Sequence, residues 1–282
     1  MLPTFVIGLR EGLEAALIVG IIAAFLIQRD ERRALRPMWA GVVLAIGLCG
    51  AFAVAVSEFG RNLSFHQREI LEATLSIVAV LGVTYMIVWM RRHSRGLKRS
   101  LESNAEHALL EGSTWALVGL AFFAVIREGL ETAVFLLAAF ENSVNPRATG
   151  TGAVLGVAVA VTLGYGIYRG GVRINLSRFF RITGFVLVIV AAGLLSYAVH
   201  DLAEARIIEV AQGTALNLTW LLRPGSLQEA LLSGALGIRA IPSHAEAIAW
   251  LAYAIPMGLY VLWPQPRVQP PVRVEAAAPA AS

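Results

Sequence analysis

A six-residue motif with three charged residues occurs twice in this chain, both times inside a long apolar segment. Leu9–Glu14 reads Leu-Arg-Glu-Gly-Leu-Glu, and Ile126–Glu131 reads Ile-Arg-Glu-Gly-Leu-Glu. A charged side chain at the centre of a membrane-spanning helix costs about 2.5–3.5 kcal/mol on insertion scales, and such residues are functional by default. We therefore expect the fold to be built around these two copies.

The rest of the composition predicts a membrane protein. Hydrophobic residues make up 57% and charged residues 15% of the chain, and the mean hydropathy is +0.68. This indicates an all-α integral membrane protein surrounded by lipid. Seven apolar segments are long enough to cross a bilayer, at about residues 2–27, 38–57, 69–90, 115–140, 152–168, 182–199 and 247–263.

The basic residues predict the orientation of these segments. Numbered in chain order, the odd connections and the tail contain 15 Arg and Lys residues, whereas the even connections contain 6. Because basic residues collect on the cytoplasmic side, the N-terminus is expected outside and the C-terminus in the cytoplasm. Topology thus explains the net charge of +4, and no nucleic-acid partner is expected.

The spacing of the motif copies predicts an internal repeat. They lie 117 residues apart with three helices between their starts, so the second copy is inverted relative to the first. Inverted repeats with a site at the membrane midplane are a recurring plan of secondary transporters. We expect a 3+3 inverted repeat plus one extra helix in a transmembrane domain over 1–263, followed by a disordered cytoplasmic tail. The expected parts are repeat one at 1–90, repeat two at 115–200, an extracytoplasmic connection at 201–246, helix seven at 247–263 and the tail at 264–282.

Within each copy the charged residues share one helix face. At about 100° per residue they fall within an arc of about 100°, and carboxylates one turn apart can share a cation. Opposed across the repeat axis, the copies supply a formal charge of −2, which a divalent cation neutralises and a trivalent one converts to +1. Oxygen ligands favour hard cations over Cu(I) or Zn(II). The expected metal ligands are Glu11, Glu14, Glu128 and Glu131, with Arg10 and Arg127 as charge-pairing groups.

Each arginine is expected to pair with motif carboxylates when no ion is bound, because a guanidinium stays charged when buried. On the other face of the first helix, Gly8, Gly12 and Ala16 form a ridge of small residues for close helix contact. The alternative that the charges only lock two helices together as ion pairs fits less well, because the motif is duplicated, confined to one face and net negative.

With these motifs the chain resembles the oxidase-dependent iron transporter family, which contains fungal high-affinity iron permeases and bacterial EfeU-type ferrous/ferric iron permeases. The mark of that family is Arg-Glu-x-x-Glu in the first and fourth helices, and both copies match it; the likeness covers about residues 3–263. The resemblance implies multi-pass insertion in the bacterial cytoplasmic (inner) membrane and inward transport of Fe(II) or Fe(III), with the four glutamates as iron ligands. It also implies a periplasmic iron-binding protein and a haem peroxidase or oxidase as partners.

Two further groups are candidates for the outer side. Glu72 stands where the family has a Glu followed by Gly, although this chain has Ala73, and it is a candidate metal ligand of an outer vestibule. His200, Asp201 and Glu204 share a face if the helix continues by one turn, and they could capture cations at the extracytoplasmic mouth. The competing interpretations are an ordinary interfacial acid for Glu72 and a solvated helix end for the other group.

The rival functions are a carrier for another hard divalent cation such as Mn(II) and a membrane di-metal oxidoreductase. Di-iron sites of helix bundles typically use Glu-x-x-His pairs, whereas both motifs here are Glu-x-x-Glu. The chain also has no Gly-x-x-x-x-Gly-Lys-Ser/Thr motif for ATP. A transporter rather than an enzyme is therefore expected, with iron as cargo and no organic cofactor.

The expected orientation can be tested with a reporter that is active only outside the cytoplasm. Because of the asymmetry in basic residues, fusions after Val144 and within 201–246 should be active, whereas fusions after Gly96 and in the tail should be silent. An active reporter in the tail, at normal expression, would reverse the orientation.

Overall fold

The computed structural model describes residues 1–93, 103, 114–143, 145–168, 176–207, 211, 213–217 and 240–263. Over these residues the fold is all-helical, with one isolated β-bridge between Thr214 and Ser243. The predicted tail and much of the predicted connection 201–246 lie outside the described residues. The elements are α1 (Leu2–Gln28), η1 (Arg32–Ala34), α2 (Leu35–Arg61), α3 (Phe65–His93), α5 (Thr114–Glu141), α6 (Pro146–Tyr168), α7 (Leu176–Glu204) and α9 (His244–Leu262).

The seven predicted helices are therefore confirmed, and six of them are long and apolar enough to span a membrane. The remaining helix, α5, is also long enough to span a membrane. It differs from the other six in that every 18-residue stretch of it contains the three charged residues of the second motif copy. Several helices extend beyond the predicted apolar segments, because polar residues at the ends of an apolar run also adopt helical backbone. α7, for example, reaches Glu204 rather than residue 199, so the predicted connection begins four residues later than expected.

Large apolar side chains remain exposed along the outside of the bundle. Val43 on α2, Val154 on α6 and Ile248 on α9 are each more than 60% exposed. Spread over several helices, such exposure is unfavourable in water and favourable against lipid tails. It supports the prediction of a multi-pass membrane protein.

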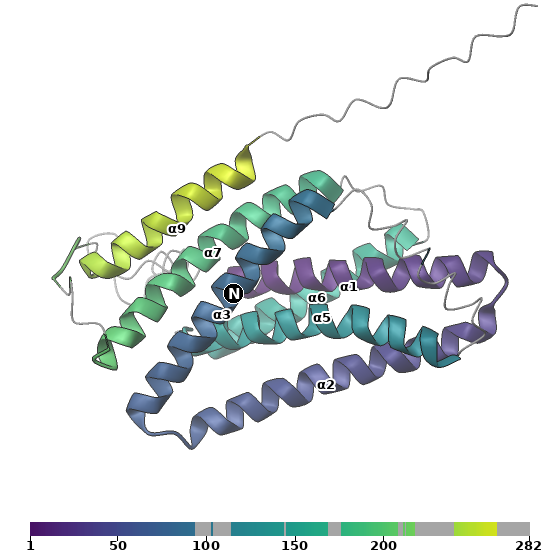
Figure 1. Ribbon diagram of the computed structural model, residues 1–282, viewed down its shortest axis with the longest axis horizontal. Helices are drawn as coiled ribbons and strands as arrows, with labels where there is room; N and C mark the ends of the chain where they lie inside the picture. Colours follow the sequence, from purple (N-terminus) through teal and green to yellow (C-terminus); the bar gives the residue numbers. More distant parts are fainter. Residues whose placement is uncertain are drawn as a thin grey trace, which may run out of the picture.

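The helix contacts place the two motif helices at the centre. α1 packs against α6, α5 and α7, and α5 packs against α2, α1 and α3; α3 also packs against α7, and α7 against α9 (Figure 1). Apart from the contact of α7 with α9, these contacts are unchanged when α1, α2 and α3 are exchanged with α5, α6 and α7. The described residues of α5 and α6 also contact each other, more extensively than those of α1 and α2. The extra helix α9 lies on the outer side of α7.

Two apolar clusters pack on either side of the motif copies. One joins the start of α1 to the end of α5, with Ile7 and Phe135 among its members. The other joins the end of α1 to the start of α5, with Ile22 and Val125 among its members. α1 and α5 are therefore antiparallel, and the charged residues of both copies form a polar layer between two apolar ones.

Glycines allow α1 to approach α6 closely. A Cβ added at Gly8 would lie 2.7 Å from the carbonyl oxygen of Ala153, and one at Gly12 would lie 2.9 Å from the Cβ of Ala160. From the other helix, a Cβ at Gly164 would lie 2.6 Å from the Cβ of Ala16. The small-residue ridge predicted on the first helix is thus confirmed, and its partner is a matching ridge on α6.

This packing predicts a position-specific effect of a single methyl group. In Gly156→Ala the new Cβ would overlap the carbonyl oxygen of Phe5 and lie 2.8 Å from the amide nitrogen of Leu9. Backbone atoms cannot yield easily, so we expect a loss of about 1–3 kcal/mol in stability, as for other overpacked cores. The measurement is the thermal unfolding midpoint of the purified protein in detergent.

Gly119→Ala is the matched control, because nothing lies within 4 Å of a Cβ added at Gly119. Alanine favours the helix over glycine, so this variant should be as stable as wild type or slightly more stable. Equal midpoints for both variants would contradict the close contact of α1 with α6.

Candidate metal site between helices α1 and α5

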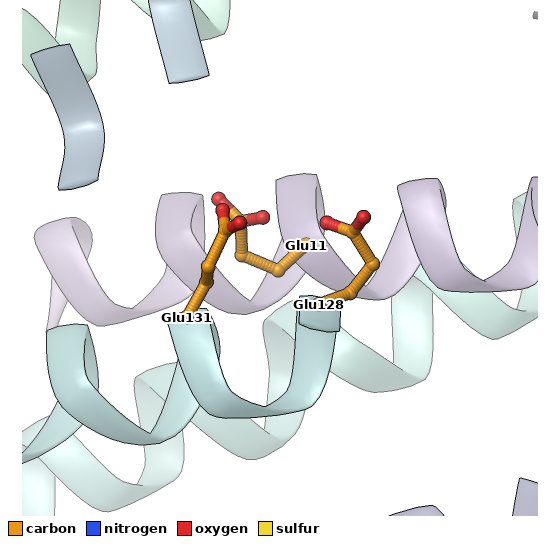
Figure 2. A group of neighbouring side chains, drawn as sticks. All are labelled: Glu11, Glu128 and Glu131. Carbon is orange, nitrogen blue, oxygen red and sulfur yellow. The ribbon is translucent and has the colours of Figure 1, made fainter. Parts of the chain in front are cut away.

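Three motif carboxylates meet between the two central helices. One carboxylate oxygen from each of Glu11, Glu128 and Glu131 lies within 4.8 Å of the other two. Figure 2 shows Glu11 reaching from α1 and the other two from α5, with the carboxyl groups gathered between the helices. Among the described residues, no other group of three or more His, Cys, Asp or Glu side chains meets in this way.

These carboxylates contain oxygens that no hydrogen bond satisfies. Both oxygens of Glu11 are buried without a hydrogen-bond partner, as is one oxygen each of Glu128 and Glu131. Glu11 is completely buried and Glu128 is only 1% exposed. Burying an ionised carboxylate without a partner is very costly, and buried charges are usually paired or bind metals. The site therefore has the charge and the free oxygen lone pairs to accept a cation.

The fourth motif glutamate, Glu14, does not join this group. Its carboxylate accepts a hydrogen bond of 3.2 Å from Nε of Arg10, one turn earlier on α1. Arg10 is 1% exposed, and its Nη2 donates to the sulfur of Met90 on α3 at 3.4 Å. The structure thus brings three of the four predicted ligands together and places the fourth against a motif arginine.

Arg127 pairs with the second motif copy in a different manner. Its Nη2 lies 2.8 Å from Oε1 of Glu128, the next residue, and its Nε lies 3.8 Å from Oε1 of Glu131. The guanidinium also stacks on the ring of Trp89, with Cζ 4.9 Å from the ring centroid. The side chain of Arg127 is 49% exposed, in contrast to the buried Arg10. The two motif arginines therefore differ in their surroundings: Arg10 is buried and Arg127 is half-exposed.

The other predicted residues lie at the end of the bundle where α3 begins and α7 ends. Glu72 is not among the three converging carboxylates. Its carboxylate accepts a hydrogen bond of 2.6 Å from Nε of Arg68. A second nitrogen of Arg68 lies 3.2 Å from Glu141 at the end of α5. The structure thus places Glu72 in an ion-pair network that links α3 to α5.

The residues proposed for capture do share the last turn of α7. Nε2 of His200 lies 2.9 Å from Glu204, and its Nδ1 lies 3.2 Å from Glu246 on α9. Asp201 is 5% exposed, and one of its oxygens has no hydrogen-bond partner. His200, Asp201 and Glu204 therefore lie together, although three ligand atoms do not converge there as they do between α1 and α5.

Sequence reasoning missed Glu246, Trp89 and Met90. Glu246 lies in the first turn of α9, where Ser243 caps the helix, and only the packing of α9 on α7 brings it to His200. Trp89 and Met90 look like ordinary apolar residues near the end of a spanning helix. The packing of α3 against neighbouring helices, which no sequence pattern reveals, places them against the motif arginines.

Comparisons with known proteins agree on one family. A model of the iron permease FTR1 family matches residues 1–264. The ferrous iron permease EfeU of Escherichia coli O6:H1 is 41% identical over 258 residues, covering 91% of this chain and 93% of the relative. The ferrous iron permease EfeU of Yersinia pestis is 40% identical over 258 residues, covering 91% of each chain. No solved structure matches this chain.

Proposed function

The chain belongs to the iron permease FTR1 family, and from this premise we propose that it carries iron across the bacterial cytoplasmic membrane through the site between α1 and α5. The single observation that carries this proposal is the convergence of Glu11, Glu128 and Glu131 with oxygens that have no hydrogen-bond partner. All-carboxylate ligation suits a hard cation. Iron is the cargo here, so the protein needs it as a substrate and not as a catalytic cofactor.

We propose that the transported species is Fe(II), because of the formal charge of the motifs and the names of the related proteins. The four glutamates and two arginines of the motifs carry a formal charge of −2, which a divalent ion neutralises. The curated relatives are named for ferrous iron. Mn(II) is the alternative cargo, because it has the same charge and also accepts oxygen ligands.

In the ion-free site the arginines stabilise the motif carboxylates by pairing with them, and an incoming ion would displace the arginines from these carboxylates. Arg10 and Arg127 each lie against motif carboxylates, and an incoming cation would compete for the same oxygens. Glu14 remains a proposed ligand, because it becomes available once Arg10 moves away from it. When iron binds, the carboxylates would thus lose a guanidinium partner and gain a bond to the metal, so they would not be left without a partner.

We also propose that α1–α3 and α5–α7 are the two halves of an inverted repeat. The antiparallel motif helices and the exchangeable helix contacts support it. With the N-terminus outside, the end of the bundle that holds Glu72, His200, Asp201 and Glu204 would face the periplasm and receive iron. A periplasmic iron-binding protein and a haem peroxidase or oxidase stay predictions from family resemblance.

Removing single carboxylates tests the site. Glu11→Gln, Glu128→Gln and Glu131→Gln keep the side-chain size and remove a charged ligand, and each should lower Fe(II) uptake by more than about tenfold. Glu14→Gln should also impair uptake, because it removes the partner of Arg10. Uptake would be measured in vesicles reconstituted with purified protein and normalised to folded protein, with Fe(II) kept reduced.

Glu58→Gln provides the matched control, since this glutamate pairs with Arg61 at the exposed end of α2. It should transport at the wild-type rate. Two or more motif variants transporting at that rate would refute the site. The two candidate cargoes, Fe(II) and Mn(II), are distinguished by measuring how far excess Mn(II) or Zn(II) inhibits Fe(II) uptake by the wild-type protein. Stronger binding of Mn(II) than of Fe(II) would favour Mn(II) as the cargo.

A further inference from the structure

Two consecutive residues of α3 contact the two motif arginines, one each. The ring of Trp89 stacks on the guanidinium of Arg127, with 4.9 Å between Cζ and the ring centroid. The sulfur of Met90 accepts a hydrogen bond of 3.4 Å from Nη2 of Arg10. These arginines come from different helices and different motif copies, so this short stretch of α3 contacts both copies.

Neither contact uses a carboxylate oxygen. A cation–π contact uses the electron-rich face of a ring, and a thioether sulfur is a weak neutral acceptor. Neither group competes with a cation for oxygen ligands. Arg127 can therefore keep one favourable partner, the Trp89 ring, while Glu128 and Glu131 turn from its guanidinium to an ion.

The end of α3 is itself held in place. Next to Met90, Nη2 of Arg91 donates a hydrogen bond of 2.6 Å to the carbonyl oxygen of Trp263, just after α9. The same guanidinium lies 4.4 Å from the ring centroid of Tyr260 on α9. α9 thus anchors the stretch that contacts the arginines, which gives this helix a role in the transport site although it supplies no motif residue.

We propose that Trp89 and Met90 are positioning residues of the permease, which hold the guanidinium groups of Arg127 and Arg10 while the motif carboxylates bind the ion. The inference rests on the proposed function, because it concerns the step at which iron displaces arginine from carboxylate. Without Trp89, the partners that Arg127 keeps among the described residues are the carboxylates of Glu128 and Glu131, so Arg127 would compete with iron for them more strongly. The apparent affinity for iron, rather than the amount of folded protein, should then fall.

The test is the dependence of initial Fe(II) uptake on iron concentration in reconstituted vesicles. Trp89→Leu should raise the half-saturating iron concentration by about two- to thirtyfold, the range of cation–π energies from exposed to desolvated sites. Trp89→Phe keeps a ring face and should restore most of the affinity. Met90→Leu keeps the volume without the sulfur and should cause a smaller rise in the same direction.

Trp89→Met serves as a second variant without a ring if Trp89→Leu folds poorly, and it should raise the half-saturating concentration as well. Trp39→Leu, at an exposed position on α2, is the matched control and should leave it unchanged. An unchanged value in both non-aromatic variants, or equal rises in the Phe and Leu variants, would overturn the inference. No saturable iron uptake by the wild type would instead refute the proposed function, which keeps the two failures distinct.

Discussion

The constraint on which the rest of the structure depends is a set of negative charges buried between two apolar layers. Four carboxylate oxygens of Glu11, Glu128 and Glu131 have no hydrogen-bond partner there. Such charges are stable only with compensating partners, because low-dielectric surroundings penalise an unpaired ion by several kcal/mol or more. Two arginines supply part of that compensation, and a bound cation would supply the remainder. This explains why the motif combines Arg with Glu instead of presenting carboxylates alone.

The motif also contains the means to bring its two copies together. Its central glycine points away from the carboxylates, and in both copies this face contacts a neighbouring helix. A Cβ added at Gly12 would lie 2.9 Å from Ala160 on α6, and one at Gly129 would lie 2.6 Å from the sulfur of Cys49 on α2. On its glycine face α1 thus packs against α6 and α5 packs against α2, while the charged face of each motif helix meets the other copy. One pentapeptide, Arg-Glu-Gly-Leu-Glu, encodes both the site and the packing that forms it.

Much of this arrangement could be predicted from the sequence, because it depends on local periodicity. The helix count, the shared face of each motif copy and the small-residue ridge follow from residue spacing alone. The sequence could not show that Glu14 pairs with Arg10 instead of joining the other three motif carboxylates. Nor could it show that Arg10 is buried while Arg127 is half-exposed. A strict repeat predicts equivalent environments, whereas the end of α3 contacts the two arginines in different ways, through the sulfur of Met90 and the ring of Trp89. Trp89 and Met90 were missed because their contacts depend on how α3 packs against its neighbours and not on its sequence pattern.

The central claim is that one cation binds between α1 and α5 on carboxylates from both motif copies. The most direct measurement is anomalous diffraction at the iron absorption edge from crystals of the protein loaded with Fe(II) under reducing conditions. We expect the strongest anomalous peak within coordination distance of Glu11, Glu128 and Glu131. A peak only beside His200, Glu204 and Glu246, with nothing between the motif helices, would contradict the claim.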